Sequence, residues 1–238
     1  SVPLTAIAFF MLTGELMTSA TITDRLVALS RALIGRIRGG LAQVNVLVSM
    51  FFAGMNGSVV ADTATVGALV LPAMKKAGYP AAFSAAVTGV SSTIGGIIPP
   101  SIMMIVLANA TEISIASLFA AGIIPGILIG VVIMVINHYF AVKHNFERSD
   151  EPFSVRRAGK ELYRSSFALL IPLVLVGSVM GGVASVVEAG AITALVALFT
   201  GVFVYRTIKW KDCTGAFRRA FRNSAMVFII IAASGPFS

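Results

Sequence analysis

The sequence predicts an all-α integral membrane protein with several membrane spans, a re-entrant helical hairpin and a broken helix. Of its 238 residues, 57% are hydrophobic and 12% are charged, whereas soluble domains carry about 25% charged residues. The charges fall in blocks. The nearly uncharged stretches between these blocks are long enough to cross a bilayer, which takes about 20 apolar residues.

The basic charge balance fits this fold class. Loops rich in Lys and Arg on one side of a membrane account for the net charge of +8, so no nucleic-acid partner is needed. The chain has a single cysteine, Cys213, which excludes an intramolecular disulfide and a cysteine-rich metal site.

The first forty residues predict one span followed by a helix of a different kind. Residues 3–20 are apolar and form the span. From Thr23 to Arg38, apolar residues alternate with four arginines. This pattern predicts an amphipathic helix in the headgroup plane, capped by Thr23 and ended by Gly39-Gly40.

Two short apolar segments, residues 41–55 and 59–76, come next. Each is too short or too broken to span a bilayer comfortably. Joined at residues 56–58, they predict a re-entrant hairpin whose two ends share one membrane face. Basic residues flank both ends of the hairpin, which agrees with this interpretation: Arg36, Arg38, Lys75 and Lys76.

The following segment, residues 81–110, predicts a span that Gly95-Gly96 and Pro99-Pro100 split in the middle. With the hairpin open to one side, every basic residue falls on a single face, which the positive-inside rule makes cytoplasmic. Two acidic residues near span ends, Glu15 and Glu188, are interpreted as interfacial groups. The remaining apolar segments predict spans at 115–142, 167–183, 187–205 and from 224 onward. Six apolar segments in all can therefore cross the bilayer.

Asp62 is the only charged residue in the hairpin before its basic end. A carboxylate at the centre of a bilayer helix costs roughly 2.5–3.5 kcal/mol, so a partner or a function is expected for it. Two roles remain open: Asp62 helps to hold a cation, directly or indirectly, or it caps the hairpin tip.

The two interrupted segments predict a binding site. Non-helical backbone at membrane depth persists only where protein or a water-filled cavity satisfies it, so four helix ends are expected to meet. Carbonyl-bearing ends at residues 52–55 and 93–95 suit an alkali cation, and amide-bearing ends after Ser58 and Pro100 suit a carboxylate. Pro100 fits the first helical position. Ser91, Ser92 and Thr93 can bind a substrate or their own helix backbone. The sequence therefore predicts a cation-coupled carrier of an organic acid, with these candidate substrate-binding residues: Asn56, Gly57, Ser58, Ser91, Ser92, Thr93 and Ser101.

Several motifs resemble the large membrane subunit of the tripartite ATP-independent periplasmic (TRAP) transporters. The hairpin carries Gly57-Ser58, Ala61-Asp62 and Pro72-x-Met74, in the order of that family's signature. The similarity extends over essentially the whole chain. Gly96 stands where the family often has Pro, and Asn56 where it often has Ser. Further matching segments are 10–17, 91–101, 118–126 and 187–190.

The resemblance implies an inverted-repeat transporter of the elevator type in the bacterial inner membrane, crossing it several times. It implies sodium-coupled import of an organic acid, such as a C4-dicarboxylate or sialic acid, delivered by a periplasmic substrate-binding protein. A small membrane subunit, separate or fused, is the implied second partner, and sodium is the coupling ion without any further cofactor. The implied sodium site lies on the backbone, with Asp62 in support, at Ala53, Asn56, Gly95, Ile98 and Pro100.

The corresponding domain organisation has four parts, and the chain is expected to be an internal fragment with an incomplete second repeat. The transport domain comprises the hairpin 41–76, the broken helix 81–110 and the span 115–142. An alternative is a sodium/dicarboxylate carrier of related architecture that works without a binding protein. An enzyme is disfavoured, because no histidine is predicted near Ser58 or Asp62. The four parts are residues 1–40 (scaffold span and amphipathic cytoplasmic arm helix), 41–142 (transport domain), 143–164 (cytoplasmic loop) and 165–238 (scaffold spans of the second repeat, truncated).

Overall fold

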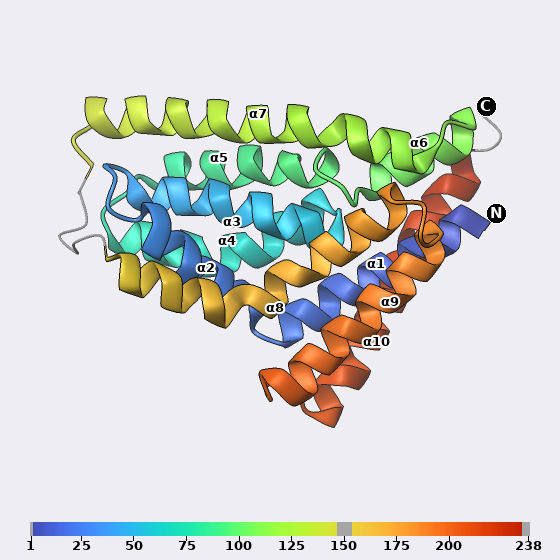
Figure 1. Cartoon of the computed structure of the whole chain (residues 1–238). Coiled ribbons are helices and arrows are strands. Elements are labelled where there is room, and N and C mark those ends of the chain that lie inside the picture. The colour runs from blue at the N-terminus through green and yellow to red at the C-terminus, as the bar shows by residue number, and fades with distance from the viewer. Residues whose placement is uncertain (1, 147–153, 235–238) are drawn as a thin grey trace.

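The computed structural model describes residues 2–146 and 154–234, and every regular element in these ranges is a helix. The all-α prediction is therefore confirmed for the described part of the chain. Figure 1 shows the arrangement of the elements, which are α1 (Val2–Ser19), α2 (Ile22–Ile34), α3 (Gly40–Asn56), α4 (Val59–Lys76), α5 (Ala81–Ser92), a 3₁₀ turn (Thr93–Gly96), α6 (Ile102–Thr111), α7 (Ile115–Lys143), α8 (Val155–Met180), α9 (Val186–Phe199), a π turn (Thr200–Val204) and α10 (Trp210–Ser234).

Helices α3, α4, α5 and α7 pack together, with α6 continuing beyond the 3₁₀ turn (Figure 1). We call α3 to α7 the hairpin domain. The stripe of α4 that faces this core has a spacing of four residues, as a helix requires. It begins with a charged side chain and continues with apolar ones: Asp62, Val66, Val70 and Met74.

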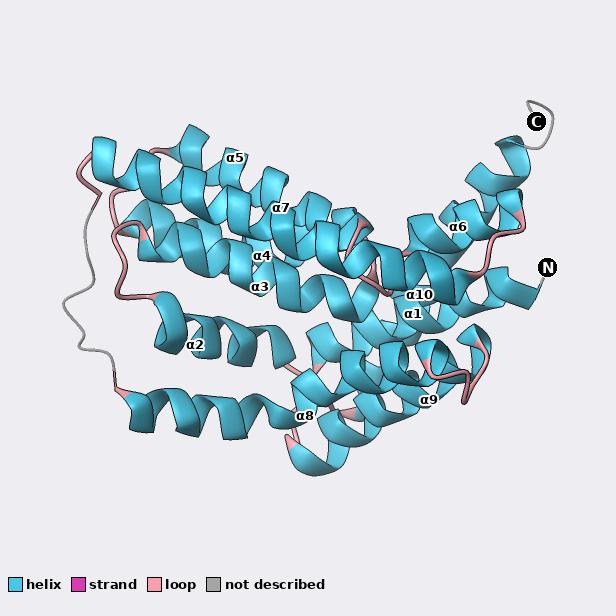
Figure 2. Cartoon of the chain, turned by 45° about the horizontal axis from the view of Figure 1, so that its top comes forward, coloured by secondary structure: helices cyan, strands magenta, loops and turns pink. Residues whose placement is uncertain are grey.

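A second group of helices consists of α1, α8, α9 and α10. Helix α1 packs along α9 and α10, and α8 packs against α9. The backbones of α1 and α9 come close at Gly190, where an added Cβ would lie 3.0 Å from the Cβ of Phe9. Helix α2 contacts both groups, through α3 and through α8 (Figure 2).

The amphipathic helix is shorter than predicted. It begins at Ile22, after Thr21 in the left-handed conformation with a φ of 54°, so Thr23 lies inside the first turn and is not the cap. It ends at Ile34 rather than at Arg38. The bend that follows is flanked by Gly35, Gly39 and Gly40. Glycine lowers the free energy needed for the backbone to depart from helical geometry.

The predicted loop at 143–164 is wrong over its second part. Helix α8 begins at Val155, with the Ser154 hydroxyl accepting a hydrogen bond from the Arg157 amide at 3.3 Å. Residues 147–153 lie outside the described part. Charged residues suggested a loop here, but Arg, Lys and Glu are good helix formers on an exposed face. In the same way, the basic segment before Ser224 is the first half of α10.

Three described helices are individually long and apolar enough to cross a membrane: α7, α8, and α9 together with its π turn. Helices α1 and α2 would add a fourth if they formed one span, but they bend by 71°. This is fewer than the six crossing segments predicted, because the break shortens α5 and α6 and charges interrupt α10. Several apolar helices nevertheless support a multi-pass membrane protein.

Candidate functional site

The two predicted helix breaks lie against each other. The amide of Ile102, at the start of α6, donates a hydrogen bond to the carbonyl oxygen of Gly57 at 3.2 Å. On the other side of the break, a Cβ added to Gly95 would lie 3.6 Å from the backbone of Ser58. The hairpin tip therefore touches the broken helix both before and after the interruption.

Gly57 makes this contact possible. It adopts a φ of 60°, and its amide donates to the carbonyl of Ala53 at 3.2 Å, which closes the end of α3. A Cβ at this position would collide with the carbonyl oxygen of Pro100. Both the left-handed backbone and the close approach thus require glycine.

Two helices start at the junction, and a serine caps each of them. The Ser58 hydroxyl accepts from the Ala61 amide at 3.3 Å, and the Ser101 hydroxyl accepts from the Met104 amide at 3.3 Å. Ser101 also donates to the carbonyl of Gly96 at 2.8 Å. We had predicted that Pro100 occupies the first helical position; this is wrong, because Ser101 is the cap of α6 and Pro100 precedes it. The amide-bearing ends of α4 and α6 thus meet, an arrangement that favours an anion.

The predicted sodium-binding backbone borders the same junction. Ala53 and Gly95 are buried, and the amide of Ile98 donates to the carbonyl of Ile94 at 2.9 Å within the turn. Pro100 lies directly against Gly57. Asn56 ends α3, but its side chain lies outside the described part of the structure.

The three predicted hydroxyls before the break point in different directions. Thr93 is exposed and donates to the carbonyl of Val90 at 2.7 Å. Ser91 and Ser92 are completely buried and donate to the carbonyl of Thr88 at 3.2 and 2.8 Å. All three hydroxyls therefore donate to the backbone of their own helix, which is the alternative to substrate binding that the sequence analysis left open.

Ser91 and Ser92 belong to a buried polar cluster that the sequence analysis did not identify. Asn45 donates to the Thr88 hydroxyl at 2.7 Å and accepts from Ser91 at 3.3 Å. Ser49 donates to Ser91 at 3.4 Å. A signal was present, because Asn45 and Ser49 on α3, and Thr88 and Ser92 on α5, are spaced by four residues and so share a helix face.

A cavity of about 420 Å³ lies beside the hairpin tip. Helix α4 contributes Ser58 and Ala61, α1 contributes Glu15, and α10 contributes Asn223. The cavity thus separates the hairpin from the second group of helices. Asp62 is on the opposite face of α4, within the hairpin core.

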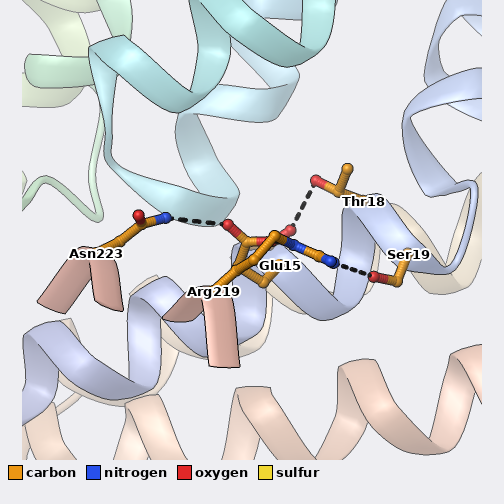
Figure 3. A network of polar contacts seen from close by, with 6 residues as sticks. Glu15, Thr18, Ser19, Arg219 and Asn223 are labelled. Atoms are coloured by element: carbon orange, nitrogen blue, oxygen red, sulfur yellow. Dashed lines mark hydrogen bonds and ion pairs between the residues drawn. The ribbon is translucent and has the colours of Figure 1, made fainter. Parts of the chain in front are cut away.

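Glu15 is the centre of a polar network beside this cavity (Figure 3). Its carboxylate accepts from Arg219 Nε at 2.6 Å and from Asn223 at 3.1 Å. Arg219 also donates to Ser19 at 3.0 Å. We had interpreted Glu15 as an interfacial group; the structure adds that it forms an ion pair between α1 and α10. Its partners are about 200 residues away in sequence, so no local pattern could have revealed it.

Comparisons with known proteins identify similar chains. Residues 1–238 match the family model described as "Tripartite ATP-independent periplasmic transporter, DctM component". The chain is 36% identical over 229 residues to the C4-dicarboxylate TRAP transporter large permease protein DctM of Pseudomonas aeruginosa, covering 96% of this chain and 53% of the relative.

Two further relatives are similar to the same extent. The sialic acid TRAP transporter large permease protein SiaM of Vibrio cholerae is 34% identical, with 96% of this chain and 53% of the relative covered. The 2,3-diketo-L-gulonate TRAP transporter large permease protein YiaN of Escherichia coli is 34% identical, with coverage of 98% and 55%. The chain thus spans about half the length of these curated relatives.

Proposed function

Because this chain belongs to the DctM-component family of tripartite ATP-independent periplasmic transporters, we propose that it serves in the sodium-coupled import of an organic acid. The family assignment confirms the resemblance that its motifs indicated. The relatives described above are named as transporter permeases rather than enzymes, which agrees with the prediction of a non-enzymatic function.

The observation that carries the proposal is the junction of the two helix breaks. Helix ends of both polarities converge there, held by the Ile102-to-Gly57 hydrogen bond of 3.2 Å. Each helix end carries about half an elementary charge. The ends of α3 and of the 3₁₀ turn present carbonyl groups suited to sodium, and the starts of α4 and α6 present amides suited to a carboxylate.

The substrate class follows from the same chemistry. The relatives are named for C4-dicarboxylates, sialic acid and 2,3-diketo-L-gulonate, all of which carry a carboxylate. A periplasmic substrate-binding protein would deliver such an acid, and a small membrane subunit, separate or fused, would complete the complex in the inner membrane. Several apolar helices suit that location.

The mechanism we propose is an elevator movement of the hairpin domain past α1, α8, α9 and α10. Its support is the division of the helices into two groups, with α2 contacting both. Sodium supplies adequate energy: one ion moving inward across 100 mV gains about 2.3 kcal/mol. A tenfold concentration gradient adds about 1.4 kcal/mol for each ion.

The test is uptake into proteoliposomes by the complete complex with its binding protein. Uptake of a candidate acid should require an inward sodium gradient and should disappear when potassium replaces sodium. Equal rates in the two salts would contradict sodium coupling. Uptake that needs sodium but not the binding protein would favour the alternative, a sodium/dicarboxylate carrier that works alone.

A further inference from the structure

One end of the hairpin domain carries a cluster of positive charge. In Figures 1 and 2, the turn between α2 and α3, the end of α4 and the end of α7 all lie at this end of the molecule. Each of these three segments contributes exposed basic side chains. We call the five residues the basic end: Arg36, Arg38, Lys75, Lys76 and Lys143.

Direct contacts hold the three segments together. Arg38 donates a hydrogen bond to the side-chain oxygen of Asn145, just after α7, at 3.0 Å. The ring of Tyr79 lies 4.8 Å from the ring of Phe146, measured between centroids. The Tyr79 amide donates to the carbonyl of Met74 at 3.0 Å, which folds this turn onto the last turn of α4. Because Asn145 and Phe146 are neighbours, one short segment joins the other two, and the five cations form a single patch.

The positive charge of the basic end is not neutralised by the described residues. None of its five cations forms an ion pair with another described residue. The described part of the hairpin domain holds two acidic residues, Asp62 in the first turn of α4 and Glu112 just before α7. Each is separated from the basic end by most of the length of a helix. On α8, by contrast, Arg164 is paired with Glu161 at 3.2 Å.

An exposed apolar surface stops where the basic end begins. Helix α7 is long and apolar enough to cross a membrane, and Lys143 is its last residue. A cation at the end of a lipid-facing helix lies at the depth of the lipid headgroups. The surface therefore changes there from one suited to acyl chains to one suited to phosphate. The exposed apolar side chains before Lys143 include Val131, Val135, Ile136, Tyr139, Phe140 and Val142.

We propose that the basic end binds the phosphate group of an anionic phospholipid, whose acyl chains lie along α7. Arginine and lysine are the usual side chains that bind phosphate. Clusters of four to eight such residues beside a membrane helix attract anionic headgroups. A soluble anion would leave the neighbouring apolar surface uncovered, so a lipid is the occupant that fits both parts. The proposal needs only a membrane location for the chain and is independent of sodium coupling.

The test is a titration of the complete complex in neutral detergent with phosphatidylglycerol that carries a fluorescent acyl chain. Phosphatidylcholine with the same label is the comparison, because its headgroup has no net charge. We expect phosphatidylglycerol to bind at least about tenfold more tightly. Removing three cations together, with Arg38→Gln, Lys76→Gln and Lys143→Gln, should abolish this preference, since each cation near an anionic headgroup contributes about fivefold.

The matched control removes one arginine and two lysines from exposed positions in and next to α10. Its substitutions are Lys209→Gln, Lys211→Gln and Arg218→Gln, and the preference for phosphatidylglycerol should remain. The acidic residues at 147, 150 and 151, outside the described part, are unchanged in both variants, so they cannot account for a difference between them.

Three results would overturn the proposal. The first is equal affinity of the wild type for the two lipids, and the second is the same preference in the two triple variants. The third is competition by soluble glycerol phosphate as strong as that by unlabelled phosphatidylglycerol, which would indicate a site for a soluble phosphate. If the triple variant of the basic end does not fold, Lys76→Gln alone decides, with an expected loss of about fivefold in affinity for phosphatidylglycerol.

Discussion

At the scale of single residues, Gly57 determines whether the hairpin tip can reach the broken helix. Its left-handed backbone turns the chain between α3 and α4, and its missing side chain leaves room for the carbonyl of Pro100. Any other residue meets both obstacles at once, and the neighbouring atom is backbone, which cannot rotate away.

Gly57→Ala should therefore destabilise the protein by roughly 1–3 kcal/mol, the range for a residue forced into a sparsely populated backbone region. Thermal unfolding of the detergent-solubilised full-length protein measures this. Gly89→Ala is the control, because Gly89 lies exposed in α5 with nothing near its Cβ position. Equal melting temperatures for the two variants would contradict the account of the tip.

Glu15 provides a second prediction at this scale. Its pair with Arg219 is direct, at 2.6 Å, but the Arg219 side chain is 44% exposed. A double-mutant cycle of Glu15→Gln and Arg219→Gln should give a coupling of about 0.2–1 kcal/mol, as for other partly exposed pairs. The pair Glu161–Arg164, three residues apart on α8, is the comparison. A coupling near zero for Glu15–Arg219 would mean that the network does not join α1 to α10.

At the scale of elements, one face of α7 supports the break. Gly122, Gly126 and Gly130 are spaced by four residues, so they lie on the same face. Side chains added there would meet Ile97, Ile98 and Met50, respectively. Gly122 and Gly126 let α7 lie directly on the irregular chain between α5 and α6, and Gly130 leaves room for the Met50 side chain of α3.

Gly122→Ala should cost about 1–3 kcal/mol, because its Cβ would collide with the carbonyl oxygen of Ile97. Gly177→Ala on α8, where nothing lies within 4 Å, should have little effect. Thermal unfolding again measures stability. Uptake by the complete complex should also fall for Gly122→Ala alone, and full uptake with normal stability would show that the break tolerates displacement.

At the scale of the whole molecule, the proposed movement requires the hairpin domain to slide over the other helices. Gly54 of α3 meets Pro172 of α8 at one such contact, where an added Cβ would lie 3.2 Å from the Cβ of Pro172. Disulfides join Cβ atoms about 3.5–4.5 Å apart, so a small shift suffices for a cross-link.

A Cys213→Ser background with Gly54→Cys and Pro172→Cys should form this cross-link on oxidation. If the hairpin domain moves as a unit, oxidation should abolish uptake and reduction should restore it. The two single-cysteine variants control for the substitutions themselves. Uptake that persists in fully cross-linked protein would exclude sliding at this contact.

Much of the element order could be predicted from the sequence, because it depends on local chemistry. The length of an apolar run, the glycines at 54, 57, 95 and 96, and the prolines at 99 and 100 are enough to place the hairpin and the broken helix. Prediction from the local sequence fails where the same residues are compatible with two different structures. The charged segment from Val155 to Arg164 fits a loop or an exposed helical turn, and only the structure shows the helix.

An all-helical membrane chain with two interrupted segments could be predicted from the sequence alone, since hydropathy and helix-breaking residues act over a few neighbours. The resemblance of its motifs added the TRAP permease family. The partners of those segments became known only from the three-dimensional packing. The partners of Glu15, the hydroxyls around Asp62 and the contact of Gly57 with Pro100 join residues distant along the chain. Such contacts follow from how whole helices pack, and packing is a property of the assembled fold.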